Sequence, residues 1–317
     1  MNILIADKFP PRWTDVLTQQ GHRITYDPAL DEKTLPTALV GQEILIVRST
    51  KVPACVIETA HDLKLIIRAG AGTNTIDTAC AAQKGVAVCN CPGTNSVAVA
   101  ELTMGLVLAL DRRIVHNTLD LRQGVWNKNE YGKAKGLFGR TIGIIGLGAI
   151  GQEVAKRARA FGMNILGYAP NGRAEKVRAL GITPIENLYE LAAQADVITI
   201  HLPENAETKG LFDQKFFDAM KPGAIFVNAA RGGLVVTSAL CQAIQNKGIK
   251  AGLDVYENEP KATDKAFDYS PYIGAENFYG THHIGASTEQ AQDAVAECVV
   301  KIVKEYATNG RFLHRVN

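Results

Sequence analysis

Short apolar runs alternate with segments of helical spacing along residues 1–96. The runs NILIAD, RITYDP, EILIVRST, LKLIIRAG and VAVCNC have the character of strands, and RWTDVLTQQG has the spacing of a helix. Short runs rich in Val and Ile that alternate with helical patterns predict βαβ units and a parallel sheet. We therefore expect the first part of the chain to form an α/β domain.

A second series of strand-like runs begins after a long apolar segment. That segment, SVAVAELTMGLVLALDRRIVHNTLDLRQG from Ser96, predicts one or two buried helices because it is rich in Ala, Leu and Met. The later strands are TIGIIG, NILGYAP, DVITIHLP, AIFVNAARGG, IKAGLDVYENEP and NFYGTHHIG, and helical patterns cover 152–160, 188–194 and 238–247. An amphipathic helix over 288–307 is expected to return to the first domain. The predicted domains are therefore 1–96 with 286–317, and 97–285.

Composition and charge exclude several classes of function. The 317 residues contain 34 Lys and Arg against 32 Asp and Glu, with no basic stripe, which argues against nucleic-acid binding. No apolar stretch approaches the roughly 20 residues of a membrane span. The start MNILIADKFPP lacks the features of a secretion signal, so we expect a cytoplasmic protein. Cys89 and Cys91 have no second Cys/His pair nearby, so no metal site is expected.

Three glycines follow the strand TIGII. Gly146, Gly148 and Gly151 form a G-x-G-x-x-G pattern that ends one strand and opens a helix, and another strand, NILGY, follows. In that context the first glycine makes the turn, the second admits a pyrophosphate and the third allows helix and strand to pack. We expect a dinucleotide to bind here, at a helix start that includes Ala149 and Ile150.

One element of the dinucleotide pattern is missing. The end of the second strand should carry an Asp or Glu that binds the adenosine ribose, and this position is Ala169. Without a carboxylate, nothing repels a 2′-phosphate, and Asn171 or Arg173 could bind one. The sequence predicts NAD and leaves NADP possible.

Several motifs together resemble the D-isomer-specific 2-hydroxyacid dehydrogenase family. They are RAGAGTNTID, CPGTNSVAVAELTMGL, GLGAIGQEVAKRARAFGM, HLPENAETKGLF, MKPGAIFVNAARGGLV, AGLDVYENEP and HIGAST, and they extend over nearly the whole chain. The resemblance implies an α/β fold of two doubly wound parallel-sheet domains. One would be a Rossmann dinucleotide-binding domain and the other a discontinuous, flavodoxin-like substrate domain.

The resemblance also assigns catalytic roles. Arg231 would bind the substrate, His283 would be the acid and base, and Glu259 its acidic partner. A planar guanidinium can bind a carboxylate and the neighbouring carbonyl oxygen in one plane, and histidine exchanges a proton near neutral pH. The neighbours His282 and Glu257 are the alternatives. The position directly before IGAST favours His283, and the position directly before proline favours Glu259.

Further positions follow from the same resemblance. Asp254 would contact the nicotinamide amide, with a turn cap as its alternative role, and Leu202 and Ala230 would line the cofactor groove. The backbone amides of Ala71 and Gly72 would hold the substrate carboxylate in a glycine-rich, anion-binding turn.

The substrate prediction rests on four cations. Arg48, Lys51, Arg68 and Lys128 lie in VRSTK, IRAG and GVWNK, segments that resemble those of 3-phosphoglycerate dehydrogenases. Cations that converge on a dianion stabilise it better than a single cation does. We expect these four residues to lie together at strand ends of the first domain. This favours oxidation of 3-phospho-D-glycerate, in serine biosynthesis, by a short form without the regulatory C-terminal domain of longer relatives.

Two alternatives remain open at this point. The first is a glyoxylate/hydroxypyruvate reductase, for which NADP and Ala169 would fit. The second is a non-catalytic dinucleotide-sensing scaffold of the corepressor type, against which the intact catalytic residues argue. The segment after Ser96 resembles the dimer arm of the family, so a homodimer is expected.

Overall fold

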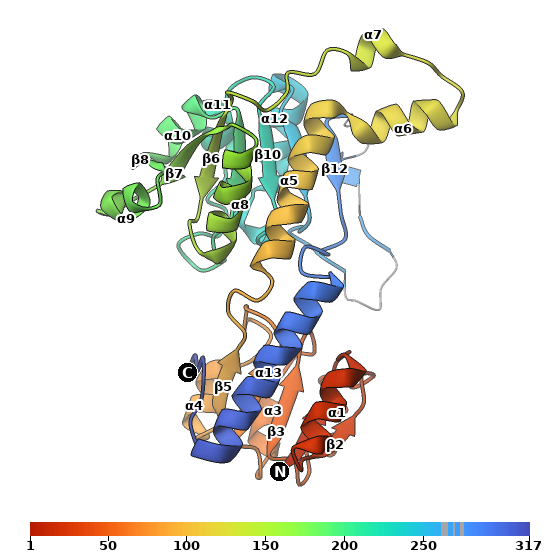
Figure 1. Ribbon diagram of the computed structural model, residues 1–317, viewed down its shortest axis with the longest axis vertical. Coiled ribbons are helices and arrows are strands. Elements are labelled where there is room, and N and C mark those ends of the chain that lie inside the picture. The colour runs from red at the N-terminus through yellow and green to blue at the C-terminus, as the bar shows by residue number, and fades with distance from the viewer. Residues whose placement is uncertain (261–265, 269, 273–275) are drawn as a thin grey trace. The chain divides into compact units, whose positions relative to one another are not determined.

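The structure of the chain is a computed structural model that describes residues 1–260, 266–268, 270–272 and 276–317. These residues divide into two compact units, 1–95 with 286–317, and 96–285. Each unit contains a parallel sheet with helices on both faces (Figure 1). The predicted α/β fold class is thereby confirmed.

The first unit is built on a parallel sheet of order β2-β1-β3-β4-β5 among the described residues. Its strands are β1 (Asn2–Ile5), β2 (Arg23–Tyr26), β3 (Ile44–Val47), β4 (Leu65–Arg68) and β5 (Ala87–Asn90). Its helices are α1 (Pro11–Gln19), α2 (Leu35–Ala38), α3 (Ala54–Thr59), α4 (Thr78–Gln83) and α13 (Glu289–Asn309). This strand order is flavodoxin-like. The direction in which successive strands are added to the sheet changes between β1 and β3, although the strands themselves are parallel.

Both faces of the first sheet are covered. Helices α1 and α13 bury one face through residues such as Leu17, Val299 and Ile302, and α13 crosses in front of the sheet in Figure 1. Helices α2, α3 and α4 bury the other face. The strands are apolar on both sides, as a doubly covered parallel sheet requires.

The second unit contains a larger parallel sheet, whose order over the described residues is β12-β11-β10-β9-β6-β7-β8. Its strands are β6 (Thr141–Ile145), β7 (Asn164–Tyr168), β8 (Thr183–Ile185), β9 (Val197–Ile200), β10 (Ile225–Asn228), β11 (Lys250–Leu253) and β12 (Phe278–Gly280). The order is that of a Rossmann fold, and it reverses between β6 and β9. Ligands of such sheets bind beyond the carboxyl ends of the strands at this point.

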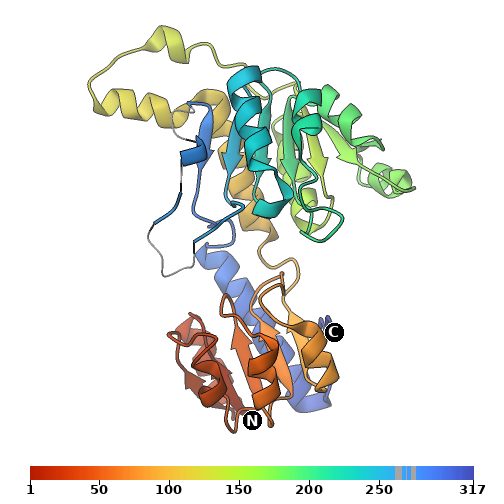
Figure 2. The ribbon, with the colours of Figure 1, turned by 180° about the vertical axis from the view of Figure 1, so that it is seen from behind.

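Helices cover both faces of the second sheet. The helices of this unit are α5 (Ser96–Arg112), α6 (Ile114–Arg122), α7 (Lys128–Tyr131), α8 (Ala149–Ala160), α9 (Ala174–Ala179), α10 (Leu188–Gln194), α11 (Gln214–Ala219) and α12 (Thr237–Lys247), of which α6 and α7 extend away from the sheet (Figure 1). Helices α5 and α8 pack on the face seen in Figure 1, and α12 lies on the face seen in Figure 2. Two short 3₁₀ helices, Gly232–Leu234 and Ser270–Tyr272, complete the described elements.

Two details differ from the sequence-based expectations. Of the apolar segment after Ser96, α5 buries ten residues, whereas α6 buries none. The second predicted buried helix is therefore an exposed one. The edge strand β8 was not predicted, because three residues that include Pro184 give a weak strand signal. No helix in the described part of the chain combines the length and apolarity needed to cross a bilayer.

Candidate active site

The glycine turn after β6 has the local structure expected of a dinucleotide-binding turn. Gly146 has a φ of +101°, and a Cβ there would lie 2.6 Å from the carbonyl oxygen of His201. A Cβ at Gly151 would lie 2.1 Å from the Gly146 carbonyl oxygen. At Gly148, by contrast, a Cβ would meet nothing within 4 Å. The first and third glycines are thus required by the fold, and the second leaves open space.

The start of α8 fits an anionic group. Gly148 is the N-cap residue, no side chain caps the helix, and its first turn, which begins at Ala149 and Ile150, contains no acidic residue. The amino end of a helix carries unsatisfied N–H groups and a partial positive charge. Since this end also lies at the β6/β9 reversal, the residues present fit the pyrophosphate of a dinucleotide.

His201 lies beside the same turn and was not singled out from the sequence. Its Nε2 is 3.0 Å from Thr199 Oγ1, while its Nδ1 is buried and has no partner among the described residues. Burial lowers the pKa of His201 to about 3, so the ring is neutral at physiological pH. An unpartnered buried nitrogen next to the glycine turn is a second feature that fits a ligand there.

The other predicted cofactor positions are placed as follows. The Leu202 nitrogen would lie 3.1 Å from a Cβ at Gly146, so it borders the turn. Ala230 is buried directly after β10. Ala169 follows β7 and its side chain is fully buried, so it presents no surface to a ribose. Asn171 and Arg173, just beyond that strand end, are exposed.

His283 and Glu259 form a direct pair. His283 Nδ1 lies 2.7 Å from Glu259 Oε2, and Glu259 Oε1 accepts a 3.0 Å hydrogen bond from the Tyr256 N–H. Glu257, the alternative carboxylate, instead accepts a hydrogen bond from the Thr237 hydroxyl at 2.9 Å. The imidazole is half exposed and keeps its Nε2 outside this pair.

Asp254 fixes the turn that carries His283. The carboxylate is almost fully buried and accepts hydrogen bonds from the Thr281 hydroxyl at 2.6 Å and from the N–H groups of Ile284 and Gly285 at 2.8 Å. The His283 N–H donates to the Asp254 carbonyl at 2.8 Å. This turn holds His283 at a φ of +53°, in the left-handed region. Asp254 is therefore a turn cap, and one of its about four acceptor positions remains for another donor.

Arg231 lies on the turn after β10. Buried Asn228 holds that turn, because its amide donates to the Arg231 carbonyl at 2.8 Å and accepts from the Ala230 N–H at 2.9 Å. The guanidinium is half-buried and donates to the Ala230 carbonyl at 2.6 Å. Asn228 was not identified from the sequence, because only the folded turn shows what its side chain binds.

The electrostatics of Glu259 link these residues. Burial, the largest single effect, favours the neutral form of this carboxyl group, and the hydrogen bond and charge of His283 act against it. The Tyr256 N–H and the charge of Arg231 act in the same direction, so the pKa of Glu259 lies below its ordinary value. At neutral pH Glu259 is therefore a carboxylate, paired with the His283 ring and influenced by the Arg231 guanidinium.

The predicted substrate residues of the first unit lie at the carboxyl end of its sheet. Arg48 follows β3, and Arg68 ends β4. Arg68 folds over the next turn, since a Cβ at Gly70, with its φ of +146°, would lie 1.6 Å from Arg68 Nη1. Ala71 and Gly72 continue this turn and are half-buried.

Lys128 is placed differently from the sequence-based interpretation. It is the first residue of α7, exposed, and belongs to the second unit rather than to a strand end of the first. GVWNK resembles a segment of the same relatives as VRSTK and IRAG do. A shared resemblance does not mean that the three segments lie on the same unit of the fold.

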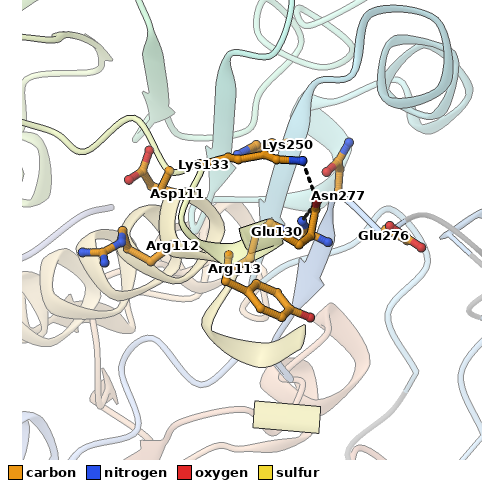
Figure 3. A pocket seen from close by; sticks show the side chains of 10 residues that line it. Asp111, Arg112, Arg113, Glu130, Lys133, Lys250, Glu276 and Asn277 are labelled. Carbon is orange, nitrogen blue, oxygen red and sulfur yellow. Dashed lines mark hydrogen bonds and ion pairs between the residues drawn. The ribbon is translucent and has the colours of Figure 1, made fainter. Parts of the chain in front are cut away.

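A cavity of about 340 Å³ lies at the opposite end of the second sheet from His283 (Figure 3). It contacts Lys250 at the start of β11 and Asn277 just before β12, and Glu130 in its lining pairs with Arg113 and Lys133. It contains none of the predicted site residues and is not the candidate active site. No cluster of three potential metal-ligating side chains occurs within the described ranges.

Comparisons with known proteins identify the family of the chain. The sequence profile of the D-isomer specific 2-hydroxyacid dehydrogenase NAD binding domain matches residues 104–285. The chain belongs to this family and contains its NAD-binding domain. The glycine turn, Arg231, Glu259 and His283 all lie within the matched segment.

Individual relatives differ in length and in name. The chain is 40% identical over 307 residues to a D-3-phosphoglycerate dehydrogenase of Methanocaldococcus jannaschii, covering 96% of this chain but 57% of that relative. It is 42% identical over 279 residues to a hydroxypyruvate reductase of Thermotoga maritima, covering 87% and 89%. A crystal structure of NAD⁺-bound 3-phosphoglycerate dehydrogenase from Entamoeba histolytica has a TM-score of 0.80 at 25% identity, covering 100% of this chain and 98% of that one. The chain thus spans little more than half the length of the archaeal enzyme.

Proposed function

We propose that the protein is a D-2-hydroxyacid dehydrogenase that uses NAD to oxidise 3-phospho-D-glycerate to 3-phosphohydroxypyruvate, a reaction of serine biosynthesis. The observation that carries the proposal is the His283–Glu259 pair at 2.7 Å, on a turn capped by Asp254. An imidazole held by a carboxylate suits proton exchange with a substrate hydroxyl. The pair belongs to an NAD-binding domain, which supports a redox reaction.

The chain's own residues supply binding and proton transfer. Arg231 binds the substrate carboxylate and the C2 oxygen through its planar guanidinium. His283 Nε2 accepts the proton of the C2 hydroxyl, and Glu259 stabilises the imidazolium that results. When bound, NAD would accept a hydride from C2. In the reverse direction, His283 returns the proton to the ketone oxygen.

Other residues hold the dinucleotide in this proposal. The open space at Gly148 and the start of α8, with Ala149 and Ile150, receives the pyrophosphate. Leu202 and Ala230 line the groove. The free acceptor position of Asp254 receives the carboxamide of the nicotinamide, so that one buried carboxylate both caps the histidine turn and orients the reacting ring.

The proposed contacts for the phosphate and carboxylate of the substrate are mainly in the first unit. Arg48, Lys51 and Arg68 bind the phosphate, and the N–H groups of Ala71 and Gly72 bind the carboxylate. Lys128 of the second unit is a further proposed phosphate contact.

A second candidate is a glyoxylate/hydroxypyruvate reductase that uses NADPH. Two observations favour it: the hydroxypyruvate reductase relative is matched over 89% of its length, and residues 169–173 after β7 contain no carboxylate but include the exposed Arg173. A positive side chain at a strand end that lacks the ribose-binding carboxylate suits a 2′-phosphate.

Steady-state kinetics tests the proposal. Purified protein is mixed with NAD or NADP and with 3-phosphoglycerate or D-glycerate, and the absorbance of the reduced nicotinamide is followed. Turnover with NAD and 3-phosphoglycerate is expected. Reduction of hydroxypyruvate with NADPH alone would favour the second candidate. Dinucleotide binding without turnover of any hydroxyacid would contradict both enzymes and favour a sensing scaffold.

Two neighbouring histidines provide a matched control. His283→Gln should lower kcat by about 100-fold or more, because it removes the proton acceptor. His282→Gln changes an exposed imidazole in the same turn and should leave kcat near the wild-type value. Equal losses in the two variants would contradict the role of His283.

We also propose that the protein forms a homodimer through α6. This helix buries none of its residues, and Ile114, Val115, Leu119 and Leu121 are about half exposed, followed by Trp126, which is 79% exposed. Several exposed apolar side chains on one helix suit burial against a second copy of the chain. Analytical ultracentrifugation should give twice the chain mass for the wild type and for Val40→Asp, a control in the first unit. Leu119→Asp should give one chain mass.

A further inference from the structure

The loop after β3 is wrapped around a carboxylate from the end of β1. Asp7 Oδ2 accepts hydrogen bonds from the N–H groups of Arg48 at 2.6 Å and of Ser49 and Thr50 at 3.1 Å. Its other oxygen accepts from the Ser49 hydroxyl at 3.0 Å. Successive N–H groups that converge on one point form an anion-binding concavity, and here the anion is part of the chain.

This contact lies at the point where the first sheet reverses its strand order. Strands β1 and β3 are parallel neighbours, with Ile5 opposite Ile46, so their carboxyl ends meet at one edge. Such a reversal point is where doubly wound sheets bind ligands. In this unit, Asp7 occupies the amide concavity at the reversal point, and the side chains of the loop are left to face a ligand.

The loop is also fixed at its far end. The Val52 N–H donates to the Thr75 carbonyl at 2.8 Å, and the Asp77 N–H donates to the Val52 carbonyl at 3.0 Å. Thr50 Oγ1 donates to the Ala6 carbonyl at 3.2 Å. Between these anchors lie Arg48, which is half-buried, and Lys51, which is exposed. Neither side chain forms an ion pair with another described residue.

We propose that Asp7 is a positioning residue: its carboxylate holds residues 48–51 in the conformation that presents Arg48 and Lys51 to the phosphate of the substrate. The inference rests on the proposed function, since it requires a phosphorylated hydroxyacid. Three of the four backbone N–H groups of residues 48–51 are already paired with Asp7, so the contribution of this loop to phosphate recognition falls to its two cationic side chains. A dianion that meets two preorganised cations binds more tightly than one that must order a free loop.

The test compares phosphorylated and unphosphorylated forms of one substrate. With NADH, KM and kcat are measured for 3-phosphohydroxypyruvate and for hydroxypyruvate. Asp7→Ala removes all four hydrogen bonds, so the KM for 3-phosphohydroxypyruvate should rise at least about tenfold, the equivalent of one lost charge-assisted hydrogen bond. The kcat values and the KM for hydroxypyruvate should change less than about threefold, since in the proposal this loop binds the phosphate, which hydroxypyruvate lacks.

Two further variants separate positioning from general damage. Asp7→Asn should lie between the wild type and Asp7→Ala, because its amide oxygen can accept the three N–H groups while its NH₂ donates to Ser49 Oγ. Asp27→Ala is the matched control: this exposed carboxylate caps the Ala29 N–H at the same sheet edge, after β2, and its loss should leave both KM values unchanged.

Each outcome distinguishes the inference from the proposed function. Parallel losses on both substrates in the Asp7 variants, or no loss on either, would overturn the positioning role while the proposed function stands. A wild-type protein that does not prefer 3-phosphohydroxypyruvate to hydroxypyruvate would refute the proposed substrate and the positioning role with it. If Asp7→Ala does not fold, Asp7→Asn carries the same comparison.

Discussion

Gly232 packs directly against the main chain of Tyr256. A Cβ at position 232 would lie 1.9 Å from the Tyr256 carbonyl oxygen and 2.5 Å from the Glu257 nitrogen. The turn that carries Arg231 and the segment that leads to Glu259 are therefore held in contact through their backbones. The separation of guanidinium and carboxylate depends on a residue that has no side chain.

Gly232→Ala should consequently damage the site. The backbone on both sides would have to shift, and a displacement of about 1 Å can cost roughly 100-fold in rate. We expect kcat/KM to fall by about that factor, with a lower Tm. Gly233→Ala is the control, because a Cβ there meets the carboxylate of Glu204, the movable end of a flexible side chain. Similar losses in both variants would show that backbone contact at position 232 is not the cause.

Glu259 should give the protein an acid-sensitive contribution to stability. The pKa of this carboxyl group is lowered in the folded state, so its contribution is complete above the ordinary value of 4.5 and is lost as the pH falls through the folded value. In urea unfolding, Glu259→Gln should be less stable than the wild type at pH 7, and the difference should shrink in acid. Glu257→Gln, which removes an exposed charge and keeps an oxygen that can accept the Thr237 hydroxyl, should show a smaller difference at pH 7.

His201 should also make the stability of the protein depend on pH, beginning at a higher pH than Glu259 does. Its pKa is lowered from 6.5 to about 3 by burial, so below pH 6.5 the unfolded chain binds a proton that the folded chain does not. The free energy of unfolding should therefore decrease as the pH falls from 6.5 towards 3. His201→Asn should flatten this decrease, whereas His61→Asn, at an exposed position, should leave its slope unchanged. Identical slopes for wild type and His201→Asn would contradict the assignment.

The cofactor preference can be tested at the end of β7. Arg173→Gln removes an exposed cation and should lower kcat/KM for NADP more than for NAD. Ala169→Asp places a carboxylate where ribose-binding acids occur in such folds and should raise the NAD to NADP ratio at least about tenfold. Because Ala169 is fully buried, Tm is measured alongside. If the ratio of kcat/KM for NAD to that for NADP is unchanged in both variants, residues other than these two determine the cofactor preference.

Much of the architecture is visible in the sequence because it arises from local patterns. The predicted helix over 188–194 coincides with α10, and the strand TIGII with β6. Apolar runs identify buried parallel strands, and the glycine spacing identifies the turn that Gly146 and Gly151 make. The pairing of His283 with Glu259 followed the family motif order, and the structure brings the two side chains together.

The remainder depends on contacts that no local pattern records. In the sequence, Asp7 is only an acidic residue that follows a strand. The fold shows that it accepts hydrogen bonds from three N–H groups of the loop after β3. Asn228 and His201 act through turns that exist only when the sheet has formed. The motif match that grouped Lys128 with the first domain does not hold in the fold, and the burial of Ala169, assigned to the ribose-binding position, is visible only in the structure.

The left-handed backbone at His283 has a consequence for variation at this position. An L-residue with a side chain pays about 1–2 kcal/mol for this conformation, whereas glycine adopts it freely. Replacing His283 with Gly should therefore relieve conformational strain at the expense of chemistry. A screen that selects variants for heat resistance alone would therefore enrich substitutions at this position that remove the imidazole. Thermal stability and catalytic activity make opposite demands on this one residue.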